Sequence, residues 1–293
     1  MIQHILTAIK GFFMGAANVI PGVSGGTVAL ITGIYSKIID AINSVTVPQT
    51  WKDLFHGRFK AFWEGINGSF LVALAVGILL SVFSLAKLMT YVLGNFPVQT
   101  WAFFFGLILA SAVIMFRGIQ GWTWKEVAFA LVGAALGVAI CTLTPSDTPD
   151  TMWFIFICGA LAICTMILPG ISGSFVLLIL GKYDFIMEAL DLSDLNIPVI
   201  IAFGFGCVIG ILAFAKFLHW VLGKWEKQTM VLLLGFIVGS LIKVWPWQVE
   251  VSPEIFRPAA PSSNIGWAII WAVIGFGIVI VTDIVGRRLS DGK

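Results

Sequence analysis

Asn18-Val-Ile-Pro-Gly-Val-Ser-Gly-Gly-Thr27 interrupts one apolar stretch of the chain, and Met166-Ile-Leu-Pro-Gly-Ile-Ser-Gly-Ser-Phe175 interrupts another. Proline removes a backbone donor and glycine allows positive φ, so we expect a helix to break at each Pro-Gly-x-Ser-Gly sequence. Inside a membrane, such a break persists only where it is buried or lines a polar cavity. Two broken helices at matching places in two halves of a chain indicate a transporter's binding site.

The composition indicates a polytopic membrane protein. Of the 293 residues, 59% are hydrophobic and 11% are charged, whereas an ordinary soluble domain has about 25% charged residues. The net charge of +2, without a basic run, does not suggest nucleic acid as a partner. The four cysteines lie in apolar segments without metal-ligand spacing, so we expect no metal and no other cofactor.

From residue 68 onward, apart from 152–190, six apolar segments of 18 to 26 residues are long enough to cross roughly 30 Å of hydrocarbon as helices. They are 68–93, 99–116, 126–144, 197–222, 229–246 and 265–285. Apolar segments of 16 to 19 residues flank the two breaks, at 5–20 and 27–45 and at 152–168 and 175–190. A half-helix of about 16 residues reaches only ~24 Å, which favours hairpins that re-enter the membrane over hairpins that cross it.

The chain contains two copies of one unit. A shift of 148 residues aligns the two breaks, and eleven of the 23 residues from 20 to 42 are identical to their counterparts. Beyond an insertion in the first copy, around 48–66, a shift of 129 aligns Gly77 with Gly206 and Lys87 with Lys216. We therefore expect an all-α polytopic membrane protein made of two inverted repeats, 1–145 and 146–293. Each repeat is a broken hairpin (5–45 or 152–190) followed by three transmembrane helices.

The inversion is inferred from the distribution of basic residues. If each broken pair returns to its own side, each repeat adds three crossings, and the second copy is inverted. With both termini cytoplasmic, ten basic residues then face the cytoplasm and only Arg257 faces outward, in agreement with the positive-inside rule. If each broken pair were one crossing, basic loops would face both sides. The ten are Lys52, Arg58, Lys60, Arg117, Lys125, Lys224, Lys227, Arg287, Arg288 and Lys293.

The second half-helix of each hairpin starts just after a Ser-Gly pair. A helix N-terminus presents unpaired N–H groups and about half a positive charge, which favours an anion. We therefore predict an anion site built by both breaks, and the alternative is that the hydroxyls only cap their own helices. The predicted site residues are Ser24, Gly25, Gly26, Thr27, Ser172, Gly173 and Ser174.

Four charged residues also occupy equivalent places in the two repeats. Lys87 and Lys216 lie within long apolar spans, where we predict that they attract phosphate at the two entrances; the alternative is that they snorkel to the interface. Asp40 and Glu188 end the two hairpins and are predicted coupling carboxylates. They are equally well explained as partners of the lysines or as exposed hairpin ends.

An enzymatic alternative rests on the spacing Gly-x-Ser-Gly around Ser24 and Ser172, which matches the nucleophile of an intramembrane serine hydrolase. Such an enzyme also needs a histidine near its nucleophile. His219 is the only histidine in a predicted span. One histidine fits poorly with a duplicated nucleophile, so we do not expect an enzyme.

In these motifs the chain resembles the polyprenyl-phosphate transporter (PopT) family of bacterial membrane proteins. The resemblance rests on Gly15-Ala-Ala-Asn-Val-Ile-Pro-Gly-Val-Ser-Gly-Gly-Thr27 and on Leu168-Pro-Gly-Ile-Ser-Gly-Ser174. It implies translocation of undecaprenyl phosphate from the outer to the cytoplasmic leaflet of the bacterial cytoplasmic membrane, so that the lipid is recycled for peptidoglycan and other envelope synthesis. The repeats depart from symmetry where Thr27 aligns with Phe175, which offers no hydroxyl.

The mechanism that we expect is alternating access around a phosphate site made by both breaks, with the lipid tail left in the bilayer. A passive scramblase or a small-anion secondary transporter would share these sequence features. A coupling ion, either proton or sodium, and an oligomer both stay open at this point.

Overall fold

The computed structural model describes residues 2–19, 24–143, 148–190, 195–252 and 255–291. Most of these residues are helical, and four helical segments are long and apolar enough to cross a membrane. The protein is therefore a predominantly α-helical, multi-pass membrane protein, as the composition predicts. Its tertiary contacts form two compact units, Met1–Leu85 with Leu143–Glu226 and Ala86–Thr142 with Lys227–Lys293. Each compact unit thus combines a part of each sequence repeat.

The first unit contains both broken hairpins. The first hairpin consists of α1 (Ile2–Val19), α2 (Gly25–Ile31) and α3 (Tyr35–Ser44), and the second of α9 (Met152–Ile167), α10 (Gly173–Ile179) and α11 (Tyr183–Ala189). The insertion of the first repeat forms α4 (Pro48–Phe55) and α5 (Phe59–Gly65). The unit also includes the start of α6 (Gly68–Asn95) and the first part of α12 (Ile197–Ser240).

The second half of each hairpin is two short helices, where the sequence predicted one continuous segment over 27–45 and over 175–190. The interruption falls at Gly33 and Gly181, whose φ angles are 69° and 61°. Glycine adopts positive φ without strain and commonly ends a helix in this way. The carbonyls just before these glycines are bonded in both copies, since Lys10 Nζ donates to Thr32 O and Thr148 Oγ1 donates to Leu180 O.

Glycines bring the hairpins into backbone contact with the long helices at equivalent places. A Cβ added at Gly77 of α6 would lie 2.0 Å from the Ala8 oxygen of α1, and one at Gly206 of α12 would lie 2.0 Å from the Phe156 oxygen of α9. Gly206 and Gly77 differ by 129 residues, and Phe156 and Ala8 by 148. The two sequence shifts therefore relate equivalent contacts in the folded chain.

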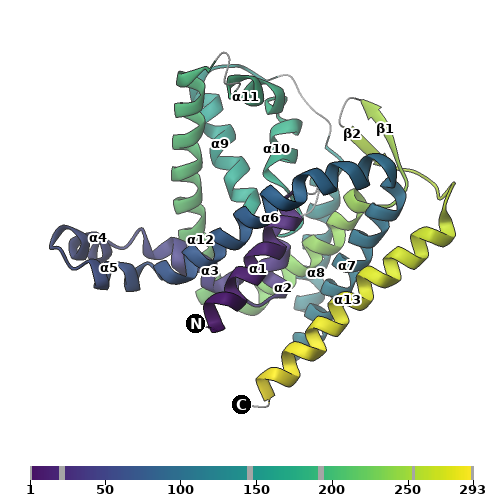
Figure 1. Ribbon diagram of the computed structural model, residues 1–293, viewed down its shortest axis with the longest axis horizontal. Coiled ribbons are helices and arrows are strands. Elements are labelled where there is room, and N and C mark those ends of the chain that lie inside the picture. The colour runs from purple at the N-terminus through teal and green to yellow at the C-terminus, as the bar shows by residue number, and fades with distance from the viewer. Residues whose placement is uncertain (1, 20–23, 144–147, 191–194, 253–254, 292–293) are drawn as a thin grey trace. The chain divides into compact units, whose positions relative to one another are not determined.

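In the second unit, each repeat packs its middle helix against the last helix of the other repeat. Helix α7 (Pro97–Gly118) lies along α13 (Ile265–Asp291), and α8 (Trp124–Cys141) packs on the later part of α12 (Figure 1). A Cβ at Gly106 would lie 2.0 Å from Ala272 O, and one at Gly235 would lie 2.0 Å from Ala130 O. Such a reciprocal exchange is typical of two-fold related elements.

Helix α12 joins the two units and bends at Trp225, where φ is −139° and ψ is 51°. Its 44 residues would extend ~66 Å, more than one membrane crossing, and the bend falls between the predicted spans 197–222 and 229–246. The chain then forms a 3₁₀ turn, η1 (Leu241–Val244), and an antiparallel hairpin of β1 (Gln248–Ser252) and β2 (Ile255–Pro258). This hairpin is a departure from the expected all-α fold.

Candidate functional site

The two breaks are joined directly by hydrogen bonds within the first unit. Ser24 Oγ, which precedes α2, donates to Leu168 O at 2.9 Å, and the Gly170 N–H donates to Thr27 Oγ1 at 2.9 Å. Gly26 is also packed against the second break, because a Cβ there would lie 2.3 Å from the Ile167 oxygen. The predicted site residues of the two repeats are therefore brought together. Pro21 and Gly22 lie outside the described residues.

The donors of the first break are bonded within the protein. Asn18 Oδ1 accepts from Gly25 N–H at 2.8 Å, Ser24 Oγ accepts from Gly26 N–H at 3.1 Å, and Ser24 O accepts from Thr27 N–H at 3.0 Å. Ser24 and Thr27 are 1% and 2% exposed. Ser24 thus caps its own helix, as in the alternative reading, and it also binds the other repeat. The role of Asn18 was missed, because the second repeat has Met166 in its place.

The second break is the more accessible one. Ser172 Oγ accepts from Phe175 N–H at 3.3 Å and lies 2.9 Å from Ser174 Oγ. Ser174 is exposed and Ser172 is half-buried, whereas Gly173 and Phe175 are buried. The sequence suggested the opposite asymmetry, with a hydroxyl offered by Thr27 and only a bulky side chain by Phe175. In the folded chain the Thr27 hydroxyl oxygen accepts the hydrogen bond from Gly170 N–H. The more accessible hydroxyls are those of Ser172 and Ser174 in the second break.

The charged residues that the repeat singled out occupy different surroundings. Asp40 Oδ1 lies 2.8 Å from His219 Nδ1, so the carboxylate contacts a histidine of α12. Glu188 is exposed on α11. Lys216 is exposed and lines a cavity of about 590 Å³ that Asn43, Thr46, Val47, Pro48, His219, Trp220, Gly223 and Lys224 also line. Lys87 lies in α6, and its side chain is outside the described part of the structure.

Neither predicted serine is arranged like a hydrolase nucleophile among the described residues. Ser24 donates to a backbone carbonyl and Ser172 contacts Ser174, whereas His219 contacts Asp40. A serine nucleophile needs a general base within hydrogen-bond reach. Within the same ranges, no three His, Cys, Asp or Glu side chains are grouped so as to hold a metal ion. Ser24 and Ser172 therefore contact polar groups other than a histidine in the described part of the chain.

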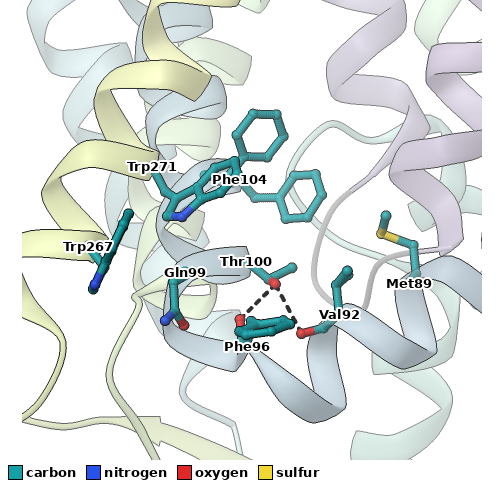
Figure 2. Close-up of a pocket in the computed structure, with 9 residues that line it drawn as sticks. Met89, Val92, Phe96, Gln99, Thr100, Phe104, Trp267 and Trp271 are labelled. Carbon is teal, nitrogen blue, oxygen red and sulfur yellow. Dashed lines mark hydrogen bonds between the residues drawn. The ribbon is translucent and has the colours of Figure 1, made fainter.

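The second unit contains an apolar pocket that the sequence did not predict (Figure 2). Its volume is about 510 Å³, and it lies between the start of α7, the end of α6 and α13. The Thr100 hydroxyl in its wall is already bonded, since it donates to Phe96 O at 2.8 Å. The cavity therefore suits hydrocarbon. Its lining consists of Met89, Val92, Phe96, Gln99, Thr100, Phe103, Phe104, Trp267 and Trp271.

Comparison with known proteins shows which family the chain resembles. Residues 14–256 match the model of a family described as undecaprenyl phosphate translocase-like. A polyprenyl-phosphate transporter of Vibrio cholerae is 41% identical over 253 residues, covering 86% of this chain and 80% of the relative. A polyprenyl-phosphate transporter of Staphylococcus aureus is 30% identical over 306 aligned positions, covering 98% of each chain. No solved structure matches the chain.

Proposed function

Because this chain belongs to the undecaprenyl phosphate translocase-like family, we propose that it carries undecaprenyl phosphate from the outer to the cytoplasmic leaflet of the bacterial cytoplasmic membrane. The names of its relatives support the wider role, transport of a polyprenyl phosphate. The lipid would then be available again for cell-envelope synthesis. The transported molecule combines a phosphate, which needs donors, with a long hydrocarbon tail, which is most stable in the bilayer.

The observation that carries the proposal is the direct joining of the two breaks. Thr27 and Gly170 belong to different repeats, and the hydrogen bond between them is buried. A movement of one hairpin against the other would therefore change both breaks together, as alternating access requires. In this mechanism the phosphate is held first by Ser172, Gly173 and Ser174. The donors of the first break bind it when the hydrogen bond between Thr27 and Gly170 opens.

The remaining charges take supporting roles in the proposal. Lys87 and Lys216 add positive charge near the two ends of the path and attract the phosphate. Asp40 and Glu188 are the carboxylates proposed to couple transport to a proton or sodium ion. The tail stays in lipid throughout, because a long hydrocarbon chain is most stable in the bilayer. The two cavities described above, of about 510 and 590 Å³, are far too small for a C55 chain.

The topology provides a first prediction. We expect single cysteines near Lys52, Lys125 and Lys224 to react with an impermeant thiol reagent only from the cytoplasm. Cysteines near Asp147 and Glu254 should react only from outside. The 2.8 Å contact between Asp40 and His219 supports this arrangement. Both residues lie near the ends of apolar segments, 27–45 and 197–222, and the proposed topology places both of these ends at the cytoplasmic side. The measurement is labelling of intact cells and of inverted vesicles, in a background without native cysteines. Labelling near Lys52 and Lys224 from opposite sides would contradict the inverted repeat.

A second prediction separates the transporter from the serine hydrolase. Ser24→Ala and Ser172→Ala should each reduce transport partially, because each removes one hydroxyl from a site with several donors. A hydrogen bond to a charged group contributes about 1.5–3 kcal/mol. His219→Ala should retain most of the activity. The measurement is crossing of undecaprenyl phosphate in proteoliposomes, read by its protection from an added phosphatase. Complete loss of activity in both Ser24→Ala and His219→Ala would favour the hydrolase.

A further inference from the structure

A cationic groove of the first unit lies between α12 and the connection from α3 to α4. Lys216, His219 and Lys224 line it from α12. His219 and Lys224 follow Lys216 by three and eight residues, spacings that place each of them on the same side of a helix as Lys216. Asn43 and Thr46 line it from the other side, and their side chains are 3.3 Å apart. The volume of the groove, about 590 Å³, is ample for a phosphate group.

The positive charge of the groove comes from its two lysines. The charge that His219 can carry is balanced by Asp40, whose Oδ1 lies 2.8 Å from His219 Nδ1. Lys224 Nζ lies 4.5 Å from the ring centre of Trp225 and 5.7 Å from that of Trp220, which orients it without neutralising it. The N-terminus of α4, which begins at Pro48, adds partial positive charge from the opposite wall.

An exposed row of aromatic rings leads away from the groove along α12. Ring centres are 5.4 Å apart between Trp225 and Trp220, 6.4 Å between Trp220 and Phe217, and 6.2 Å between Phe217 and Phe214. Phe217 and Trp220 are each 53% exposed. The row runs from the bend of α12 at Trp225 into the predicted span 197–222, which is the direction that a lipid tail would follow from a headgroup at the membrane surface.

We propose that this groove is a second phosphate site, distinct from the helix breaks, which binds the phosphomonoester headgroup of a prenyl lipid through Lys216 and Lys224. The first isoprene units lie against Trp220 and Phe217. A phosphomonoester carries about −1.5 to −2 charges at pH 7, which two lysines balance. The inference rests on the proposed function and adds a docking place for the headgroup at one end of its path.

The test is binding of geranyl phosphate to the purified full-length protein in detergent, measured by isothermal titration calorimetry. In the double variant Lys216→Gln/Lys224→Gln the binding event at the groove should weaken about tenfold or more, since two exposed charge contacts are lost, while any binding event at the helix breaks is retained. The matched control is Lys60→Gln/Lys125→Gln, which removes two exposed lysines outside the groove. The control should stay within about twofold of the wild type, and Lys216→Arg/Lys224→Arg should recover part of the loss.

Two further probes identify the source of the phosphate. Geraniol, which lacks phosphate, should bind poorly to every variant. Inorganic phosphate should bind more weakly than geranyl phosphate, and Phe217→Ala should weaken only geranyl phosphate. Equal affinity of the groove for inorganic and geranyl phosphate would overturn the assignment to a lipid. Equal binding by the groove variant and its matched control would overturn the site itself.

The outcome can be separated from the fate of the proposed function. If the wild type transports undecaprenyl phosphate and the groove variant binds and transports like its control, only the groove is overturned. If geranyl phosphate binding depends on the two lysines but the wild type moves no undecaprenyl phosphate between leaflets, the proposed function fails and the groove stands.

Discussion

Gly206→Ala should lower the apparent melting temperature of the detergent-solubilised protein by roughly 5 °C or more. The added Cβ would lie 2.0 Å from the Phe156 backbone oxygen, and a backbone atom cannot move aside as a flexible side chain can. Overpacking of this kind typically costs about 1–3 kcal/mol, and 1 kcal/mol moves the melting temperature by a few degrees in a chain of this size. The measurement is thermal unfolding followed by size-exclusion chromatography.

The neighbouring Gly204 is the matched control on the same helix. A Cβ added there meets no atom within 4 Å, so Gly204→Ala should be neutral or slightly stabilising, since alanine favours a helix more than glycine. Gly77→Ala should cause a loss similar to that of Gly206→Ala, because Gly77 makes the equivalent contact with Ala8. Equal melting temperatures for the Gly204 and Gly206 variants would contradict the close packing of α9 and α12.

Thr27→Val should impair both stability and transport, whereas Thr27→Ser should retain most of each. Valine has nearly the shape of threonine but leaves the buried Gly170 N–H without its acceptor. An unsatisfied buried donor costs about 1–3 kcal/mol, and 1.4 kcal/mol corresponds to a factor of ten in an equilibrium. The state in which the two breaks are in contact would therefore be populated about tenfold less. The measurements are thermal unfolding and transport in proteoliposomes.

The serine variant is the control for Thr27→Val, because it keeps the oxygen and loses only a methyl group. Phe175, at the equivalent position of the second repeat, has no hydroxyl group. If the valine and serine variants unfolded and transported alike, the hydrogen bond to Gly170 would have no role in joining the breaks.

The parts of the fold that the sequence predicted best are those with a strong local signal. The two Pro-Gly sequences predicted the breaks, and the shifts of 148 and 129 predicted which glycines occupy equivalent contacts, such as Gly77 and Gly206. The exchange of last helices was missed because Gly133 and Gly275 relate by a third shift, of 142 residues, without a motif around them. The β1–β2 hairpin was missed because its short segment was read only for charge.

The sequence singled out the residues of the two breaks but not the hydrogen bonds that join them. The sequence marked Ser24, Thr27 and Ser172, yet gave no sign that Thr27 accepts from Gly170 across 143 positions. The contact of Asp40 with His219 spans 179 positions and has no equivalent in the repeat, so no local sequence pattern predicts it. Long-range polar contacts depend on how helices pack, and a single sequence contains no direct signal for them.

The most direct test of the central claim is the movement of undecaprenyl phosphate by the wild-type protein alone. Proteoliposomes are prepared with the lipid in the outer leaflet, and an impermeant phosphatase is added at successive times. We predict that a growing share of the lipid becomes protected, faster than in protein-free liposomes, and that Thr27→Val slows this protection. Equal protection with and without the wild-type protein would contradict the account.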